Sequence, residues 1–240
     1  MKKVLLIATV QSHIAQFHKP LINVLHENGY EVHVAARDNL SEKNGLVLDT
    51  ADKTFNVNFS RSPYSFNNIV VYKQIKHIIS ENNYQFIHCN TPMGGVVGRL
   101  AARKARKSGT KVIYTAHGFH FFKGAPLINW LVYYPIEKIL SGFTDVLITI
   151  NKEDYERAQT FKAKRAEYIH GVGANALRFK PYDEVTIAGL KRKMGIENQN
   201  IILCIGELNK NKNQQTIIKA MPEVIKAVSN TKLLIAGNGP

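Results

Sequence analysis

The sequence predicts an α/β protein with two doubly wound parallel-sheet domains, the second present only as its first βαβ unit. Short apolar runs of strand length alternate with stretches of helical period along most of the 240 residues. A stretch without periodicity follows residue 170, and the alternation restarts after Pro181. We therefore expect an N-terminal domain over residues 1–180 and the start of a second domain over residues 181–240.

The elements of the N-terminal domain follow from these runs. Strands are expected at residues 4–10, 30–36, 54–58, 86–89, 111–115, 145–150 and 166–170. Helices are expected at residues 14–28, 67–81, 94–107, 127–140 and 152–160. Gly29 suits a left-handed cap at the end of the first helix, and Asn151 is placed to cap the start of the last.

The predicted linker between the domains runs from Gly171 to Asn175 and continues through Phe179-Lys180-Pro181. Beyond it we expect helices and strands at residues 186–194, 201–205, 214–228 and 232–236. One βαβ unit leaves a sheet edge and apolar faces uncovered. The second domain is therefore expected to be truncated at its C-terminal side.

The formal net charge of +14 indicates an acidic partner. The basic residues concentrate locally on the predicted helix 94–107, where Arg99, Arg103 and Arg106 have the spacing of one helix face and Lys107 follows. This face is either a contact for an anionic membrane surface or an ordinary solvated face. No recognition motif for nucleic acid accompanies it, so nucleic acid is not expected as a partner.

Apolar stretches are too short for a membrane-spanning helix, so we expect a cytoplasmic protein, peripheral at the inner face of the plasma membrane. Cys89 and Cys204 lie in apolar runs without metal-binding spacing, and no D-x-D pair of carboxylates is present. We therefore expect no metal and no cofactor.

Ligands of doubly wound sheets bind at the carboxyl ends of the strands. The loop after the first strand, which contains His13, has no glycine, so it cannot be a G-x-G-x-x-G dinucleotide loop. Thr91 and Gly94 follow the fourth strand, where glycines before a helix suit either an anion or close packing. His117 and Gly118 end the fifth strand, and His117 is the candidate catalytic residue.

In the second domain, the loop from Gly206 to Asn213 joins a strand to a helix. A glycine at the turn and lysines before a helix N-terminus are typical of a phosphate-binding loop. Gly206, Glu207 and Lys212 are therefore the candidate donor-binding residues.

These passages together resemble glycosyltransferase family 4, the retaining enzymes of the two-Rossmann-domain (GT-B) fold. The resemblance rests on residues 86–92 through the basic helix to Thr115-Ala116-His117-Gly118, on the linker Gly171-Val172-Gly173 with Phe179 and Pro181, and on Gly206-Glu207-Leu208 with Lys212. It is nearest to the branch that makes capsular polysaccharide or exopolysaccharide. In the family motif G-R-L-x-x-E-K-G, this chain matches Gly206, Leu208 and Lys212 but places Glu207, Asn211 and Asn213 at the positions of Arg, Glu and the last Gly.

The resemblance implies transfer of a hexosyl unit from a nucleoside diphosphate sugar to a lipid-linked saccharide acceptor, with retention at the anomeric carbon and without a metal. It also implies that Lys212 binds the donor diphosphate and that His117 orients the reactants. The chain alone is expected to be inactive, because further donor contacts of the family fall beyond residue 240. A sugar-nucleotide 2-epimerase of the same fold and a non-catalytic module that binds a partner or lipid are the alternatives.

Overall fold

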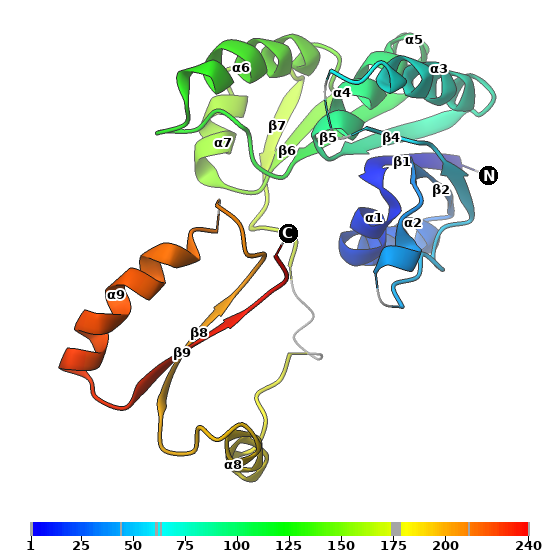
Figure 1. The fold of residues 1–240 in the computed structure, drawn as a ribbon. Coiled ribbons are helices and arrows are strands. Elements are labelled where there is room, and N and C mark those ends of the chain that lie inside the picture. Colours follow the sequence, from blue (N-terminus) through cyan, green and yellow to red (C-terminus); the bar gives the residue numbers. More distant parts are fainter. Residues whose placement is uncertain are drawn as a thin grey trace. The chain divides into compact units, whose positions relative to one another are not determined.

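The computed structural model describes residues 2–43, 45–60, 62, 64–173, 179–210 and 212–239. The chain forms two compact units, residues 1–173 and 174–240 (Figure 1). All paired strands of the described residues are parallel, in a seven-stranded and a two-stranded sheet, which confirms the predicted fold class. Of the loops predicted above, residues 174–175 and Asn211 lie outside the described part.

The sheet of the first unit has the strand order β3-β2-β1-β4-β5-β6-β7. The chain adds strands outward from β1 to β3 and then crosses back to β4, so the switch point of the topology lies between β1 and β4. The strands are β1 (Lys2–Val10), β2 (Tyr30–Arg37), β3 (Lys53–Asn56), β4 (Tyr84–Asn90), β5 (Lys111–Ala116), β6 (Val146–Thr149) and β7 (Arg165–Tyr168).

Helices cover both faces of this sheet (Figure 1). Leu5 and Ile7 of β1 belong to a first apolar cluster on one face of the sheet. Val4, Leu6 and Ala8 belong to a second apolar cluster on the other face. The second cluster is covered by α1 (Gln11–Phe17) and α2 (Lys19–Glu27). The first is covered by α3 (Asn67–Ser80), α4 (Pro92–Ala101), α5 (Arg103–Lys107), α6 (Leu127–Ser141) and α7 (Lys152–Ala158). A 3-10 turn, η1 (Leu40–Glu42), follows β2.

Two helices predicted as continuous are broken. The predicted helix 14–28 is two helices that meet at His18, because Pro20 lacks an N–H and fits only the first turn of a new helix. The predicted helix 94–107 starts earlier, at Pro92, and is interrupted at Ala102.

Both predicted helix caps of the first unit are confirmed. Gly29 has φ +77°, a conformation that residues with a Cβ rarely adopt. The Asn151 side chain accepts a hydrogen bond from the Asp154 N–H at the start of α7.

Glycines on α4 let this helix pack closely on the sheet. A Cβ at Gly95 would lie 2.4 Å from the ring of Tyr114, and one at Gly98 would lie 2.5 Å from Sγ of Cys89. Both distances are far below van der Waals contact. These two glycines therefore serve helix-to-sheet packing.

Asp145, just before β6, connects three parts of the first unit. Its Oδ2 accepts hydrogen bonds from Nε of Arg106 at 3.0 Å and from the Val112 N–H at 2.9 Å, and its Oδ1 lies 2.9 Å from Nζ of Lys164. Burial alone would raise the pKa of Asp145. The hydrogen bonds from Arg106, Val112 and Lys164 outweigh burial and hold the pKa at about 2.

We expect acid to weaken the fold through Asp145. Because its pKa in the folded protein lies below the ordinary value of 3.8, its ionised form stabilises the fold above about pH 4. That stabilisation is lost as the pH falls towards 2. Asp145→Asn should lower the free energy of unfolding at pH 7 by about 2 kcal/mol and flatten its decline below pH 4. Urea unfolding across pH 2–7 measures both, and equal acid slopes for the two proteins would contradict the assignment.

The second unit begins, among the described residues, with Phe179 and contains α8 (Glu184–Lys193), β8 (Asn200–Ile205), α9 (Gln214–Ala227) and β9 (Thr231–Ala236). β8 and β9 pair in parallel with α9 between them, which is the predicted βαβ unit. The Asp183 side chain accepts a hydrogen bond from the Thr186 N–H and caps α8. Within the described part of the chain, no helix is long and apolar enough to cross a membrane.

Candidate functional site

Polar loops follow three adjacent strands at the switch point of the first unit. His13 lies in the first turn of α1 after β1, Thr91 follows β4, and His117 follows β5. Because β1, β4 and β5 are neighbours in a parallel sheet, their carboxyl ends bring these loops together. The predicted acceptor-side residues therefore share one edge of the sheet.

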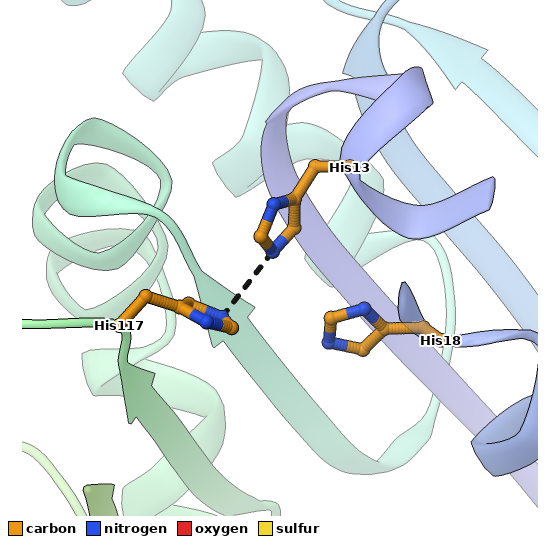
Figure 2. A group of neighbouring side chains, drawn as sticks. All are labelled: His13, His18 and His117. Atoms are coloured by element: carbon orange, nitrogen blue, oxygen red, sulfur yellow. Dashed lines mark hydrogen bonds between the residues drawn. The ribbon is translucent and has the colours of Figure 1, made fainter. Parts of the chain in front are cut away.

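His13 and His117 are in direct contact. Their Nε2 atoms are 3.2 Å apart, and the two rings meet edge to face (Figure 2). Burial lowers the pKa of His13 to about 3, with contributions from His117 and His18. Burial, and then His18, lowers the pKa of His117 to about 4. Both imidazoles are therefore neutral at pH 7, and one of the facing nitrogens donates its hydrogen to the other.

Sequence reasoning missed two further imidazoles at this edge. His18, at the break between α1 and α2, is buried, and its Nε2 lies 2.9 Å from Oδ1 of Asn90. His88 is buried on β4, with Nε2 2.8 Å from Oγ1 of Thr115, and burial lowers its pKa to about 3. Pro20 was the feature of the sequence that could have identified His18, because a proline in the first turn of a helix indicates a helix break just before it, beside β1.

Thr91 has a backbone conformation that is rare for a β-branched residue, with φ +63° and ψ 155°. Its Oγ1 accepts a hydrogen bond from the Thr9 N–H at 2.9 Å and lies 2.7 Å from Oγ1 of Thr9. A Cβ at Gly94 would lie 2.9 Å from that Oγ1 and 3.1 Å from Cα of Ala8. Gly94 thus leaves room for the hydroxyl that holds β1 and β4 together, and strained backbone of this kind occurs often at functional sites.

Gly118 continues the loop after His117 with φ +125°, a conformation that favours glycine, and it is exposed. The next residue, Phe119, is buried, and its N–H donates to Oδ2 of Asp154 at 2.9 Å. His120 stacks on Tyr133. The loop is therefore anchored immediately after the exposed Gly118.

The candidate donor loop of the second unit is a tight turn between β8 and α9. A Cβ at Gly206 would lie 3.8 Å from Cγ and Cδ of Lys212, so the aliphatic part of this lysine passes over the glycine. Oε2 of Glu207 accepts a hydrogen bond from the side chain of Asn209. Asn213 has φ 50° and ψ 43°, a left-handed conformation that asparagine tolerates better than other non-glycine residues. Asparagine is therefore compatible with the left-handed backbone that this position has before α9.

Gly237 also belongs to this loop and was missed by sequence reasoning. A Cβ there would lie 1.8 Å from the carbonyl oxygen of Gly206. The Leu208 N–H donates to the carbonyl of Asn238 at 2.8 Å, so the loops after β8 and β9 are joined through their backbones. The only signal in the sequence was a glycine directly after a strand.

The predicted exposed face of Arg99, Arg103 and Arg106 is wrong. Arg99 is fully buried: Nη2 lies 2.8 Å from Oε2 of Glu137, and Nε donates to the carbonyl of Gly95. Arg106 is half-buried and bonded to Asp145, as described above. Arg99 is turned inward because its helix, α4, packs against both α3 and α6. Arg103 and Lys107 are exposed, together with Lys104.

An apolar stripe lies exposed on α6. Leu127, Leu131, Pro135 and Ile139 follow one another at intervals of four residues, which places them on one helix face. Relative exposures are 80% for Leu127, 73% for Leu131 and 62% for Ile139. The guanidinium of Arg103 stacks on Phe143 just beyond the end of α6. Basic residues of α5 thus lie near one end of this stripe.

Comparison of the fold with solved structures places it in the GT-B class. The complex of Anabaena Alr3699/HepE with UDP and glucose has a TM-score of 0.63 at 15% identity, covering 98% of this chain and 70% of that one. The S. aureus MnaA–UDP structure has a TM-score of 0.65 at 13% identity, covering 98% of this chain and 62% of that one.

Residues 3–151 match the family described as "Glycosyl transferase 4-like", and residues 188–240 match "Glycosyl transferases group 1". The chain therefore belongs to the glycosyltransferase 4-like family.

Two relatives match most of this chain. "Putative glycosyltransferase EpsD" of Bacillus subtilis is 46% identical over 99% of this chain and 62% of its own length. An Escherichia coli protein named UDP-Gal:alpha-D-GlcNAc-diphosphoundecaprenol alpha-1,3-galactosyltransferase is 25% identical over 83% of this chain and 53% of its own length. The chain thus spans about three fifths of the first relative and about half of the second.

Proposed function

We propose that this chain is the acceptor-side domain and the start of the donor-side domain of a retaining hexosyltransferase. The enzyme transfers a hexosyl unit from a nucleoside diphosphate sugar to a lipid-linked saccharide in surface polysaccharide synthesis. The neutral His13–His117 pair at the switch point, in a chain 46% identical to EpsD, carries the proposal. The diphosphoundecaprenol acceptor in the name of the E. coli relative supports the acceptor class.

The proposed mechanism divides the work between the two units. His117, half-buried and neutral, bonds hydroxyl groups of the reacting sugars and orients them near the anomeric carbon. In the second unit, Lys212 and the N-terminus of α9 stabilise the negative charge that develops on the departing diphosphate. Glu207 contacts a ribose or acceptor hydroxyl where the family has arginine. The transfer proceeds without a metal at the diphosphate.

The test is a transfer assay with protein of the relatives' length, labelled nucleotide sugars and lipid-linked saccharide acceptors. We expect transfer with retained anomeric configuration, as seen by NMR of the product, and an undiminished rate after treatment with EDTA. The 240-residue chain alone should give no product. Release of an epimerised nucleotide sugar, with no transfer, would instead support a 2-epimerase, a class to which several solved structures of this fold belong.

We further propose that the first unit meets an anionic membrane at the inner face of the plasma membrane, where a lipid-linked acceptor is held. The contact surface is the apolar stripe of α6 with the exposed cations Arg103, Lys104 and Lys107 of α5. Apolar side chains enter the headgroup region, and each basic residue near an anionic surface contributes about 1 kcal/mol. The attachment is therefore reversible and sensitive to salt.

Liposome sedimentation tests this contact. Leu127→Ser with Leu131→Ser should reduce the fraction bound to vesicles containing anionic lipid by about fivefold or more, because two apolar groups leave the interface. Val24→Ser is the matched control, since Val24 is 52% exposed on α2, on the other face of the sheet. Equal sedimentation of all three proteins would remove α6 from the contact surface.

A further inference from the structure

Three histidines converge at the switch point of the first unit. His13, His18 and His117 each offer a ring nitrogen, and these three atoms all lie within 4.8 Å of one another (Figure 2). They come from two segments about a hundred residues apart, so the spacing of the histidines in the sequence does not predict the cluster. Imidazole nitrogen is a ligand that suits zinc, copper and nickel.

Hydrogen bonds around His18 favour one tautomer. Nδ2 of Asn90 faces the carbonyl oxygen of His88 at 3.4 Å, which directs Oδ1 of Asn90 to Nε2 of His18 at 2.9 Å. Nε2 of His18 must then carry the hydrogen. Nδ1 is left with a lone pair, and this buried atom has no hydrogen-bond partner among the described residues. Buried polar atoms without a partner are uncommon, and a bound water or ion is one of the explanations for them.

This arrangement matches the surroundings of metal-binding histidines. Such a histidine usually donates its second ring N–H to a carbonyl or carboxylate oxygen, which fixes the ring and its tautomer. Asn90, fully buried, supplies that oxygen to His18. Asn90 would therefore act as the second shell of a metal ion held by Nδ1 of His18.

The distance between His13 and His117 also fits a shared cation. Two nitrogens on one tetrahedral zinc ion, each about 2.1 Å from the metal, lie about 3.4 Å apart. The Nε2 atoms of His13 and His117 are 3.2 Å apart. Small rotations of the rings, with the third nitrogen moving inward, would complete a site with three protein ligands.

We propose that His13, His18 and His117 bind one Zn²⁺ ion. Three protein ligands leave a fourth position open, and His13 and His117 are only half-buried, so a water or substrate hydroxyl can reach it. In the proposed transferase, the ion would occupy the nitrogen of His117 that otherwise bonds a sugar. Zinc therefore inhibits transfer. This inhibition rests on the proposed function, whereas the binding of zinc does not depend on that function.

Binding is tested on the 240-residue chain after removal of metals with a chelator. Titration with Co²⁺ should give one equivalent with the intense visible bands of a tetrahedral site, and Zn²⁺ should displace it. His13→Gln and His117→Gln should each weaken Zn²⁺ affinity by more than tenfold, and Asn90→Ala by about tenfold through the second shell. His26→Gln is the matched control, because His26 is an exposed histidine bonded to Asp52 away from the cluster.

Circular dichroism of each variant separates lost binding from lost folding. Unchanged Zn²⁺ affinity in folded His13→Gln and His117→Gln, or a loss only in His26→Gln, would overturn the site. A transfer assay with added Zn²⁺ addresses the inhibition separately. Full transfer activity of zinc-loaded enzyme would overturn the inhibitory role, whereas an absence of transfer by metal-free enzyme would count against the proposed function and leave the binding result standing.

Discussion

Arg99→Met is expected to lower the free energy of unfolding by about 3–5 kcal/mol. The Arg99 side chain is fully buried, its Nη2 is 2.8 Å from Oε2 of Glu137, and its guanidinium stacks 3.9 Å from the ring centre of Tyr114. Methionine fills much of the same volume but leaves the Glu137 carboxylate, also largely buried, without its cation. An unpaired buried charge costs far more than the packing that methionine restores.

Urea unfolding of the 240-residue chain measures this effect. Arg103→Met is the matched control, since Arg103 is exposed and makes its ring contact with Phe143 at the surface, and it should cost less than about 1 kcal/mol. Adding Glu137→Gln to Arg99→Met should recover about 1–3 kcal/mol, because the unpaired charge is removed. A similar loss in the Arg99 and Arg103 variants would show that the buried pair contributes little.

His117→Ala is expected to lower kcat for sugar transfer by about tenfold or more, in protein of the relatives' length. The loss of one hydrogen bond made to the reacting sugars, worth about 1.4 kcal/mol, accounts for that factor. The fold should be unaffected, because His117 is half-buried and its ring contacts are with His13 and His18. Initial rates at saturating substrates, measured in the presence of EDTA, separate this effect from any bound zinc.

His120→Ala serves as the control for the same loop. His120 is exposed, and its ring stacks on Tyr133. A tenfold loss in His117→Ala with a nearly unchanged rate in His120→Ala would support a direct role for His117. Equal rates for wild type and His117→Ala would assign His117 a structural role only.

The sheet could be predicted from the sequence because most of its strands are short, largely apolar runs, as from Val4 to Ala8 in β1. The helix caps at Gly29 and Asn151 were predictable because their chemistry is local. The same reasoning found His13, Thr91 and His117, since each follows a strand. Sequence reasoning thus located the edge of the sheet at which these polar residues lie. The contacts between them could be identified only from the structure.

Contacts between distant segments were not predictable from spacing. The interval between Arg99 and Arg103 shows that the two residues lie near one face of a helix. It does not show whether a neighbouring helix covers that face. Small and apolar residues surround Arg99 on every side of α4, and this was the available sign that the helix is buried. His18 was missed because the periodicity of the apolar residues runs through it.

The contact between Gly237 and Gly206 limits how this loop can diversify during evolution. Any codon change at position 237 that adds a side chain places a Cβ 1.8 Å from the carbonyl oxygen of Gly206, so that carbonyl must move. The turn carrying Glu207 and Lys212 would move with it, since the Gly206 N–H donates to the carbonyl of Ala236 and the Leu208 N–H to that of Asn238. Exchange of side chains along the loop from Gly206 to Asn213 is therefore easier to accommodate than any substitution at position 237.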